Sequence, residues 1–161
     1  MKKVQITLAF ATAAAAASFP AQSAAHGGDP HNEAKAIEAA MKSPIVVRGS
    51  AGLAQLTIVH VQRGCHIWSN GKQTAAGVKV LLRRGERLSV LNQDIDTHQL
   101  VRVAGPKVAL GPALAMNGKT TVRFAKAGVY RLKTEKAAMP GMPEVETMGT
   151  DHLLAAIVVV T

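Results

Sequence analysis

The strand pattern that follows Ser50 limits most strongly what this chain can fold into. Four segments rich in β-branched and apolar residues are separated or interrupted by short glycine-containing turns. They are AQLTIVHVQ, VKVLLRRGERLSVLNQD, TTVRFAKAGVYRLKT and HLLAAIVVVT. Several short strands with turns of this kind predict an antiparallel β-sandwich or barrel. We therefore expect an all-β core domain.

The first 49 residues have a different composition. Residues 1–25 begin with MKK, continue as a mostly apolar run and end in QSAA, which is the pattern of a secretory signal peptide. The apolar run is too short and too rich in alanine to predict a membrane span. We expect residues 26–49 to form a flexible lead and one short helix, capped by Asn32 and ended before Pro44. The predicted division is a signal peptide (1–25), the lead and helix (26–49) and one domain (50–161), in a periplasmic or secreted protein.

The chain is basic, with a formal net charge of +9 over 161 residues. A basic surface favours acidic partner proteins or anionic membrane surfaces. Nucleic acid is not expected as a partner, because one Tyr and one Trp cannot form a platform on which bases stack.

Cys65 is the only cysteine, and it lies in the segment GCHIW. Exported proteins normally hold their cysteines in pairs. A single cysteine indicates a bridge to another molecule, a reactive thiol or a metal thiolate. The alternative is a buried cysteine that acts as a small apolar residue.

The order of three motifs in residues 50–161 resembles the cupredoxins, which are small copper-binding β-sandwiches. GVKVLLRRGERLSVLNQDIDTHQL resembles their central block, in which an Asn-x-Asp segment precedes a copper-ligating histidine. VRFAKAGVYRLKT resembles their Gly-x-Tyr strand, and AAMPGMPEVETMGTDH followed by HLLAAIVVV resembles their ligand loop and last strand. The resemblance implies a cupredoxin-like Greek-key β-sandwich with a short N-terminal helix and a copper site that includes His98.

The sequence departs from the family at the usual ligand cysteine. That position falls near Thr134, and no cysteine follows residue 65. We expect Cys65 to supply the missing sulfur from an early segment and to meet His98 at one end of the sandwich. Neighbouring residues on a regular strand point to opposite faces, so Cys65 and His66 can both bind one ion only if Gly64 permits a bulge or turn. Otherwise His66 is expected to pack on Trp68.

His98 follows the polar turn NQDIDT and precedes the apolar strand LVRV, where a rigid scaffold can present a ligand. Asn92 and Asp94 are expected to hold the backbone of that turn through side-chain hydrogen bonds. His60 lies inside a strand and is expected to be structural.

The remaining ligands are expected in the loop before the last strand. His152 opens that strand, and Met148 and Met142 precede it as alternatives. A thioether would favour Cu(I), whereas core packing is the alternative for the methionines. Cleavage before His26 would create a separate chelating site with His31.

Thiolate, imidazole and thioether ligands together select copper, with zinc as the competing ion. We expect electron transfer through an atypical Cys/His copper site, with an acidic redox or copper-transfer protein as partner. The alternative is a copper carrier or resistance protein that binds the ion and hands it on. No hydrolase or phosphate-binding motif is present, so the chain is expected not to be an enzyme. A metal-free sandwich used for adhesion or assembly is a further alternative.

Overall fold

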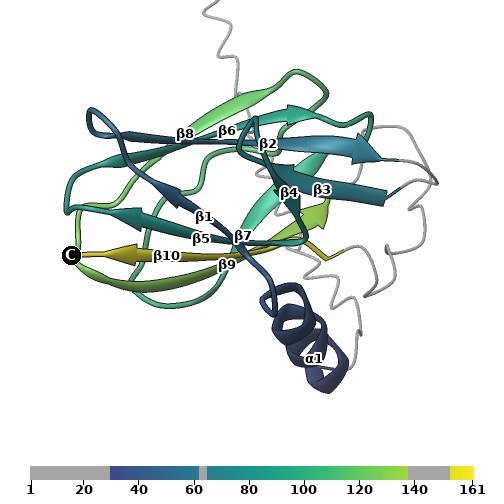
Figure 1. The fold of residues 1–161 in the computed structure, drawn as a ribbon, viewed down its shortest axis with the longest axis horizontal. Helices are drawn as coiled ribbons and strands as arrows, with labels where there is room; N and C mark the ends of the chain where they lie inside the picture. The colour runs from purple at the N-terminus through teal and green to yellow at the C-terminus, as the bar shows by residue number, and fades with distance from the viewer. Residues whose placement is uncertain (1–29, 62–64, 138–152) are drawn as a thin grey trace, which may run out of the picture.

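Two five-stranded β-sheets form the body of the protein in a computed structural model that describes residues 30–61, 65–137 and 153–161 (Figure 1). The first sheet contains, in spatial order, β1 (Ile45–Arg48), β5 (Gly77–Leu82), β10 (Ala155–Val160), β9 (Gly128–Lys136) and β7 (His98–Ala104). The second contains β4 (Thr74–Ala75), β3 (Cys65–Ser69), β2 (Leu53–Val61), β6 (Arg87–Gln93) and β8 (Lys119–Arg123). The predicted β-sandwich is confirmed.

The sheets are mixed, whereas the sequence suggested an antiparallel arrangement. β5 pairs in parallel with both β1 and β10, and β2 pairs in parallel with β6. β1 lies before the predicted domain boundary at residue 50 and yet forms an edge of the first sheet. The segment IVVR that forms it is short, so nothing in its pattern distinguished it from the end of the lead.

Two of the predicted turns connect the sheets. The turn RRGE follows β5 in the first sheet and leads to β6 in the second, while KAG joins β8 of the second sheet to β9 of the first. Gly85 in the first of these turns has a φ of 90°, a left-handed conformation that glycine adopts without steric cost. The two turns therefore close one end of the sandwich.

One helix, α1 (Pro30–Ala40), precedes β1, as predicted. It begins at Pro30, before the expected cap Asn32, because proline is favoured in the first turn, where its missing N–H is not needed. Its end meets the start of β5, where a Cβ added at Gly77 would contact the carbonyl oxygen of Ala40. Within the part of the chain that the structure describes, no helix has the length and apolar character needed to cross a membrane.

The core lies between the sheets and is mostly aliphatic. Trp68 is its largest fully buried side chain, and its indole Nε1 donates a hydrogen bond to the carbonyl oxygen of Ala155 at 3.1 Å. That bond joins β3 in one sheet to β10 in the other. Trp68 is therefore a core residue that links the two layers.

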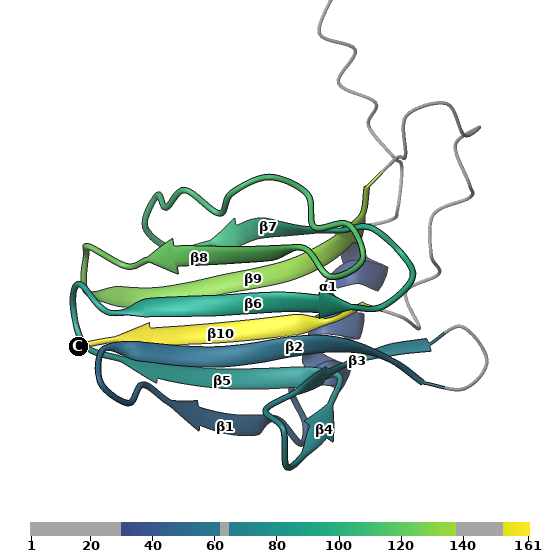
Figure 2. The same ribbon diagram turned by 90° about the horizontal axis from the view of Figure 1, so that it is seen from above.

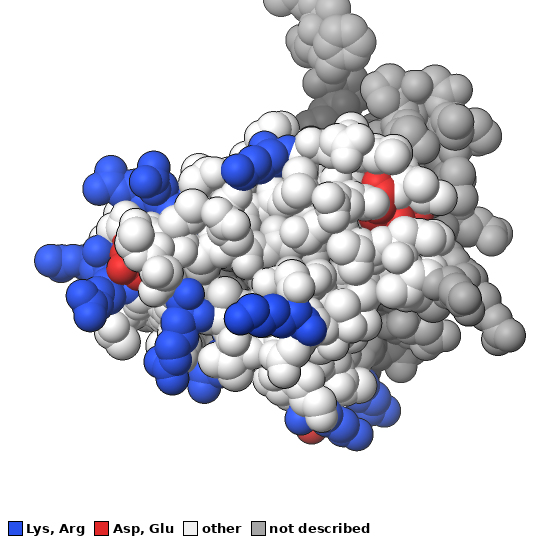
Figure 3. Space-filling model, turned by 45° about the horizontal axis from the view of Figure 1, so that its top comes forward, with Lys and Arg blue, Asp and Glu red and all other residues white. Residues whose placement is uncertain are grey.

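The strands of both sheets run between two opposite ends of the sandwich, which Figure 2 shows from above. β6 runs from Arg87 at one end to Gln93 at the other, about 20 Å away at the usual rise of a strand. At the first, which we call the arginine end, arginines lie at the ends of β1 and β8, at the start of β6 and in the turn after β5. They are Arg48, Arg83, Arg84, Arg87 and Arg123. Figure 3 shows Lys and Arg side chains gathered toward this end on the face that it presents.

Candidate metal centre

The opposite end, where β2 and β6 end and β7 begins, holds a cluster of histidines around one aspartate; we call it the histidine end. His98 is the first residue of β7, and its side chain is fully buried. Its backbone exchanges two hydrogen bonds with Leu114, at 3.0 and 2.7 Å, and it pairs with Lys136 of β9. Hydrogen bonds to Leu114 on one side and strand pairing with β9 on the other therefore fix the position from which the His98 ring extends into the protein.

Asn92 holds the turn that precedes His98. Its side-chain oxygen accepts the N–H of Asp94 at 2.9 Å, and its amide donates to the carbonyl oxygens of Asp96 at 2.7 Å and Leu114 at 2.8 Å. The predicted role of Asn92 in tying the loop backbone is confirmed. The Asn92 amide is fully buried, so breaking any of these hydrogen bonds would leave a buried polar group without a partner and would cost free energy. The turn is therefore rigid.

Asp94 does more than the backbone role that the sequence predicted. Its Oδ1 accepts the backbone N–H of Ile95 at 2.7 Å, which is the predicted local bond. The same carboxylate lies 2.8 Å from His98 Nε2, 3.3 Å from His66 Nδ1 and 3.0 Å from His60 Nδ1. A fully buried carboxylate thus contacts three imidazoles at once.

The histidines come from both sheets. His60 and His66 are directly opposed residues of the antiparallel pair β2 and β3, while His98 belongs to β7 in the other sheet. The rings of His66 and His98 meet edge to face, with centroids 4.6 Å apart. The cluster therefore joins the layers at the histidine end.

The environment of Asp94 has opposing effects on its pKa. Burial raises the pKa, but the hydrogen bonds from His98, from His60 and from the Ile95 N–H, with the positive charge that His98 can carry, outweigh burial. The pKa of Asp94 is therefore lowered below its ordinary value of 3.8.

This shift predicts an acid-sensitive contribution to stability. Because the pKa is lower in the folded state, the contribution is fully present above pH 3.8 and is lost as the pH falls toward the folded pKa. Between pH 5 and pH 2 (roughly the interval over which a paired aspartate is protonated), we expect the free energy of unfolding to change less in Asp94→Asn than in the wild-type protein. Urea unfolding at stepped pH measures this, with Asp96→Asn as the control. An unchanged acid slope in Asp94→Asn would contradict the assignment.

Two buried polar atoms at this end have no hydrogen-bond partner in the described part of the chain: His98 Nδ1 and Thr134 Oγ1. Thr134 is the position near which the resemblance places the ligand cysteine. It lies on β9 opposite Leu100, two residues along from the strand pair of His98. Buried polar groups without partners require an explanation, and an unobserved ion is one of the ordinary ones.

The donors at the histidine end fit a transition-metal ion. One ligand atom each from His66, Asp94 and His98 lies within 4.8 Å of the others, and all three residues are buried. Neutral imidazole suits copper and zinc, so the described residues are compatible with either ion. Copper held there would supply one-electron redox chemistry.

The structure brings together two of the predicted ligands, His66 and His98. Cys65 is the first residue of β3, and its backbone pairs with Val61. The five pairs of β2 with β3 run without a register shift, so the bulge invoked for joint binding by Cys65 and His66 is absent from residues 65–69. The Cys65 side chain lies outside the described part, and its ligation stays a prediction.

The other predicted ligands fall in segments that the structure does not describe. They are His152, Met148 and Met142 and, for the separate N-terminal site, His26. His31 lies in α1, but its side chain is also outside the described part. The residues that flank segment 138–152 are placed: Ala137 N–H bonds the Thr97 carbonyl oxygen at 2.9 Å, and Leu154 O accepts the Thr134 N–H at 3.0 Å. That segment therefore leaves β9 beside His98.

His60 is the member of the cluster that sequence analysis missed. His60 is the next position in the alternation of β2 after the buried residues Leu56 and Ile58. Because it lies near the end of the strand, its side chain is 38% exposed. A signal was present: His60 and His66 flank the turn VQRGC, and a hairpin about that turn places them opposite each other.

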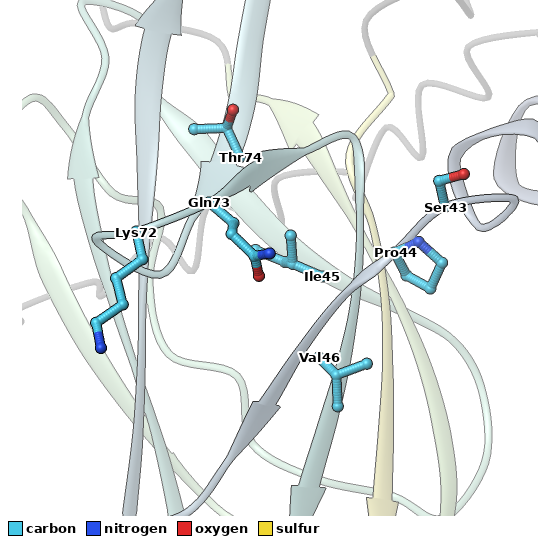
Figure 4. Close-up of a pocket in the computed structure, with 7 residues that line it drawn as sticks. All are labelled: Ser43, Pro44, Ile45, Val46, Lys72, Gln73 and Thr74. Carbon is cyan, nitrogen blue, oxygen red and sulfur yellow. The ribbon is translucent and has the colours of Figure 1, made fainter.

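A shallow hollow of about 680 Å³ is lined by residues outside the cluster (Figure 4). It is lined by the start of β1 and the turn before β4: Ser43, Pro44, Ile45, Val46, Lys72, Gln73 and Thr74. It contains none of the predicted site residues, and its lining offers no histidine, cysteine or carboxylate. We assign it no metal-binding role.

No protein-family model and no curated protein matches this sequence. Similar solved structures include the purple cupredoxin from Nitrosopumilus maritimus, at 13% identity and a TM-score of 0.41 over 66% of this chain and 98% of that one. A variant of amicyanin in the Cu(I) state has 14% identity and a TM-score of 0.39 over 70% of this chain and 85% of that one. The McoA multicopper oxidase from Aquifex aeolicus has 13% identity and a TM-score of 0.46, over 73% of this chain and 28% of that one.

The prediction that the chain is not an enzyme is contradicted by this set. It includes several multicopper oxidases and a copper-containing nitrite reductase from Thermus scotoductus, all of which are enzymes. The prediction relied on the absence of hydrolase and phosphate-binding motifs. That absence does not bear on oxidases, which use bound copper and do not need those motifs.

The likeness concerns the fold and not the activity, because every identity given above is below 15%. The chain spans 22% of the nitrite reductase and 28% of the Aquifex oxidase, which are much longer proteins. Two face-to-face sheets with one short helix form the described part of this chain, and the solved structures that resemble it include small cupredoxins. The chain has a cupredoxin-like fold.

Proposed function

We propose that this protein binds one copper ion at the histidine end of the sandwich and transfers electrons through it. The observation that carries the proposal is the fully buried His98, whose Nδ1 has no hydrogen-bond partner among the described residues. His66 packs against it, and both imidazoles extend from paired strands. Such a scaffold changes little when the charge of the metal changes, which favours electron transfer.

We propose that further ligands complete the site: Cys65, and His152, Met148 or Met142 from the segment before β10. Cys65 and His66 are neighbours on the regular strand β3, so Cys65 reaches the same ion only through a bulge or turn at Gly64, which lies outside the described residues. Segment 138–152 connects β9, the strand that pairs with β7 at His98, to β10 on the other side of β9. A ligand set of thiolate, imidazoles and thioether selects copper over harder ions. Redox cycling distinguishes copper from zinc, because zinc has no second oxidation state to cycle through. We propose that the protein is exported to the periplasm by residues 1–25.

The arginine end is proposed to attract an acidic partner protein as it approaches. It lies about the length of β6 from the histidine cluster, so its charge would speed the encounter without forming the contact through which electrons pass. Salt is therefore expected to slow association with the partner and to leave the metal site unchanged.

Loading the purified mature protein with Cu(II) and recording its visible spectrum tests the proposal. We expect an intense charge-transfer band, absent with Zn(II), that Cys65→Ser removes because the thiolate causes it. Reversible cycling between Cu(II) and Cu(I) with the metal retained supports electron transfer. Rapid loss of Cu(I) to a chelator would instead favour the copper carrier. A band unchanged in Cys65→Ser would remove Cys65 from the site.

A further inference from the structure

Both oxygens of the Asp94 carboxylate accept hydrogen bonds from protein groups. Oδ1 lies 2.7 Å from the Ile95 N–H and 3.0 Å from His60 Nδ1, and Oδ2 lies 2.8 Å from His98 Nε2. Oδ2 also lies 3.3 Å from His66 Nδ1. An ionised carboxylate has about four acceptor positions. Asp94 therefore has little capacity left for a metal ion.

These contacts decide which nitrogen of His98 carries the proton. An ionised carboxylate can only accept hydrogen bonds, so the Nε2 that lies 2.8 Å from Asp94 must be the donor. In neutral imidazole the other nitrogen, Nδ1, then holds a lone pair. Nδ1 is buried and has no hydrogen-bond partner within the described residues, so its lone pair is available to an ion.

We propose that Asp94 is a positioning residue that lies outside the coordination sphere, and that it makes His98 present Nδ1 to the metal. Carboxylates that accept the second N–H of a ligating histidine fix its tautomer and ring orientation and raise its basicity. The competing arrangement makes Asp94 a ligand with His66 and His98, whose donor atoms are close enough to share an ion. That arrangement would compete with the short bond from His98 Nε2 for a carboxylate that already accepts three hydrogen bonds.

His60 is the solvent-facing partner of the same carboxylate. Its side chain is 38% exposed, whereas Asp94 and His98 are fully buried. It donates to Oδ1, while His98 donates to Oδ2 of the same carboxylate. His60 thus supports the metal site from the surface, with Asp94 and His98 between it and the ion.

The first test observes the histidine nitrogens directly by long-range ¹H–¹⁵N NMR. In the metal-free protein we expect His98 to be protonated at Nε2 and unprotonated at Nδ1. Adding Cu(I), which is diamagnetic, should shift Nδ1 and leave the Nε2 proton in place. Protonation at Nδ1 in the metal-free protein, or loss of the Nε2 proton with Cu(I), would overturn the proposal.

The second test compares Asp94→Asn with Asp96→Asn, which removes the same charge from the same loop. Asparagine keeps the shape and one acceptor, so the fold should survive, which circular dichroism checks. We expect Asp94→Asn to weaken Cu(II) binding by about 10- to 100-fold and to raise the reduction potential, because the less basic imidazole stabilises Cu(II) less. Asp96→Asn should change neither. Equal effects of both variants, or none from Asp94→Asn, would overturn the positioning role.

The inference rests on the proposed function only where metal is added. If the wild-type protein binds no copper, the proposed function fails, and the metal-free tautomer of His98 still decides whether Asp94 orients the ring. If copper binds and the tautomer is the opposite one, the positioning role fails while copper binding stands.

Discussion

His98→Ala is expected to lower the affinity for Cu(II) by more than about 100-fold, the upper range seen when an outer partner of a ligand is removed. The effect should be larger than that of Asp94→Asn because the ligand itself is lost. No other described imidazole takes the same position at the start of β7. Competition with a chelator of known affinity measures the change.

Two controls separate this loss from a folding defect. Gln99→Ala alters the adjacent exposed residue of β7 and should bind copper as the wild type does. His98→Gly leaves a space that free imidazole can enter, so added imidazole should restore part of the binding. An affinity that stays within a few-fold of wild type in His98→Ala would remove His98 from the site.

Trp68→Ala is expected to lower the free energy of unfolding by about 3–5 kcal/mol, the usual cost of truncating a large buried aromatic residue. The indole is 1% exposed and fills the space between β3 and β10. Urea unfolding followed by circular dichroism measures the loss, since the variant lacks the only tryptophan that fluorescence could follow.

Trp68→Phe distinguishes packing from the hydrogen bond in the same position. Phenylalanine keeps most of the buried ring but cannot donate to the carbonyl oxygen of Ala155. The lost bond alone should cost about 1 kcal/mol, with a further penalty for the smaller ring. A loss below 1 kcal/mol in Trp68→Ala would show that the core closes around the space and that the indole does not hold the layers together.

The strands were predictable because alternation and β-branched residues are local signals. β2, β5, β6, β8, β9 and β10 coincide with segments that the sequence identified. Parallel pairing was not predictable, because it depends on which sheet a strand joins after a turn. The turns RRGE and KAG have the composition of hairpin turns and yet cross between the sheets.

The site was predictable only in part for a similar reason. His98 could be identified because the turn before it and the strand after it are both visible in the sequence. The convergence of His60, His66 and Asp94 depends on the register of β2 with β3 and on contact between them and the β6–β7 turn. Asp94 was assigned a backbone role because the sequence does not reveal that two opposed strand residues lie against its carboxylate.

The position of β10 has a consequence for when the chain can fold. Residues 155–160 form the middle strand of the first sheet, between β5 and β9, and hydrogen-bond to both. Until that segment has emerged from the ribosome, β5 and β9 lack the neighbour that joins them, and the inner face of the second sheet lacks its full cover. Nascent chains shorter than this should therefore remain sensitive to protease.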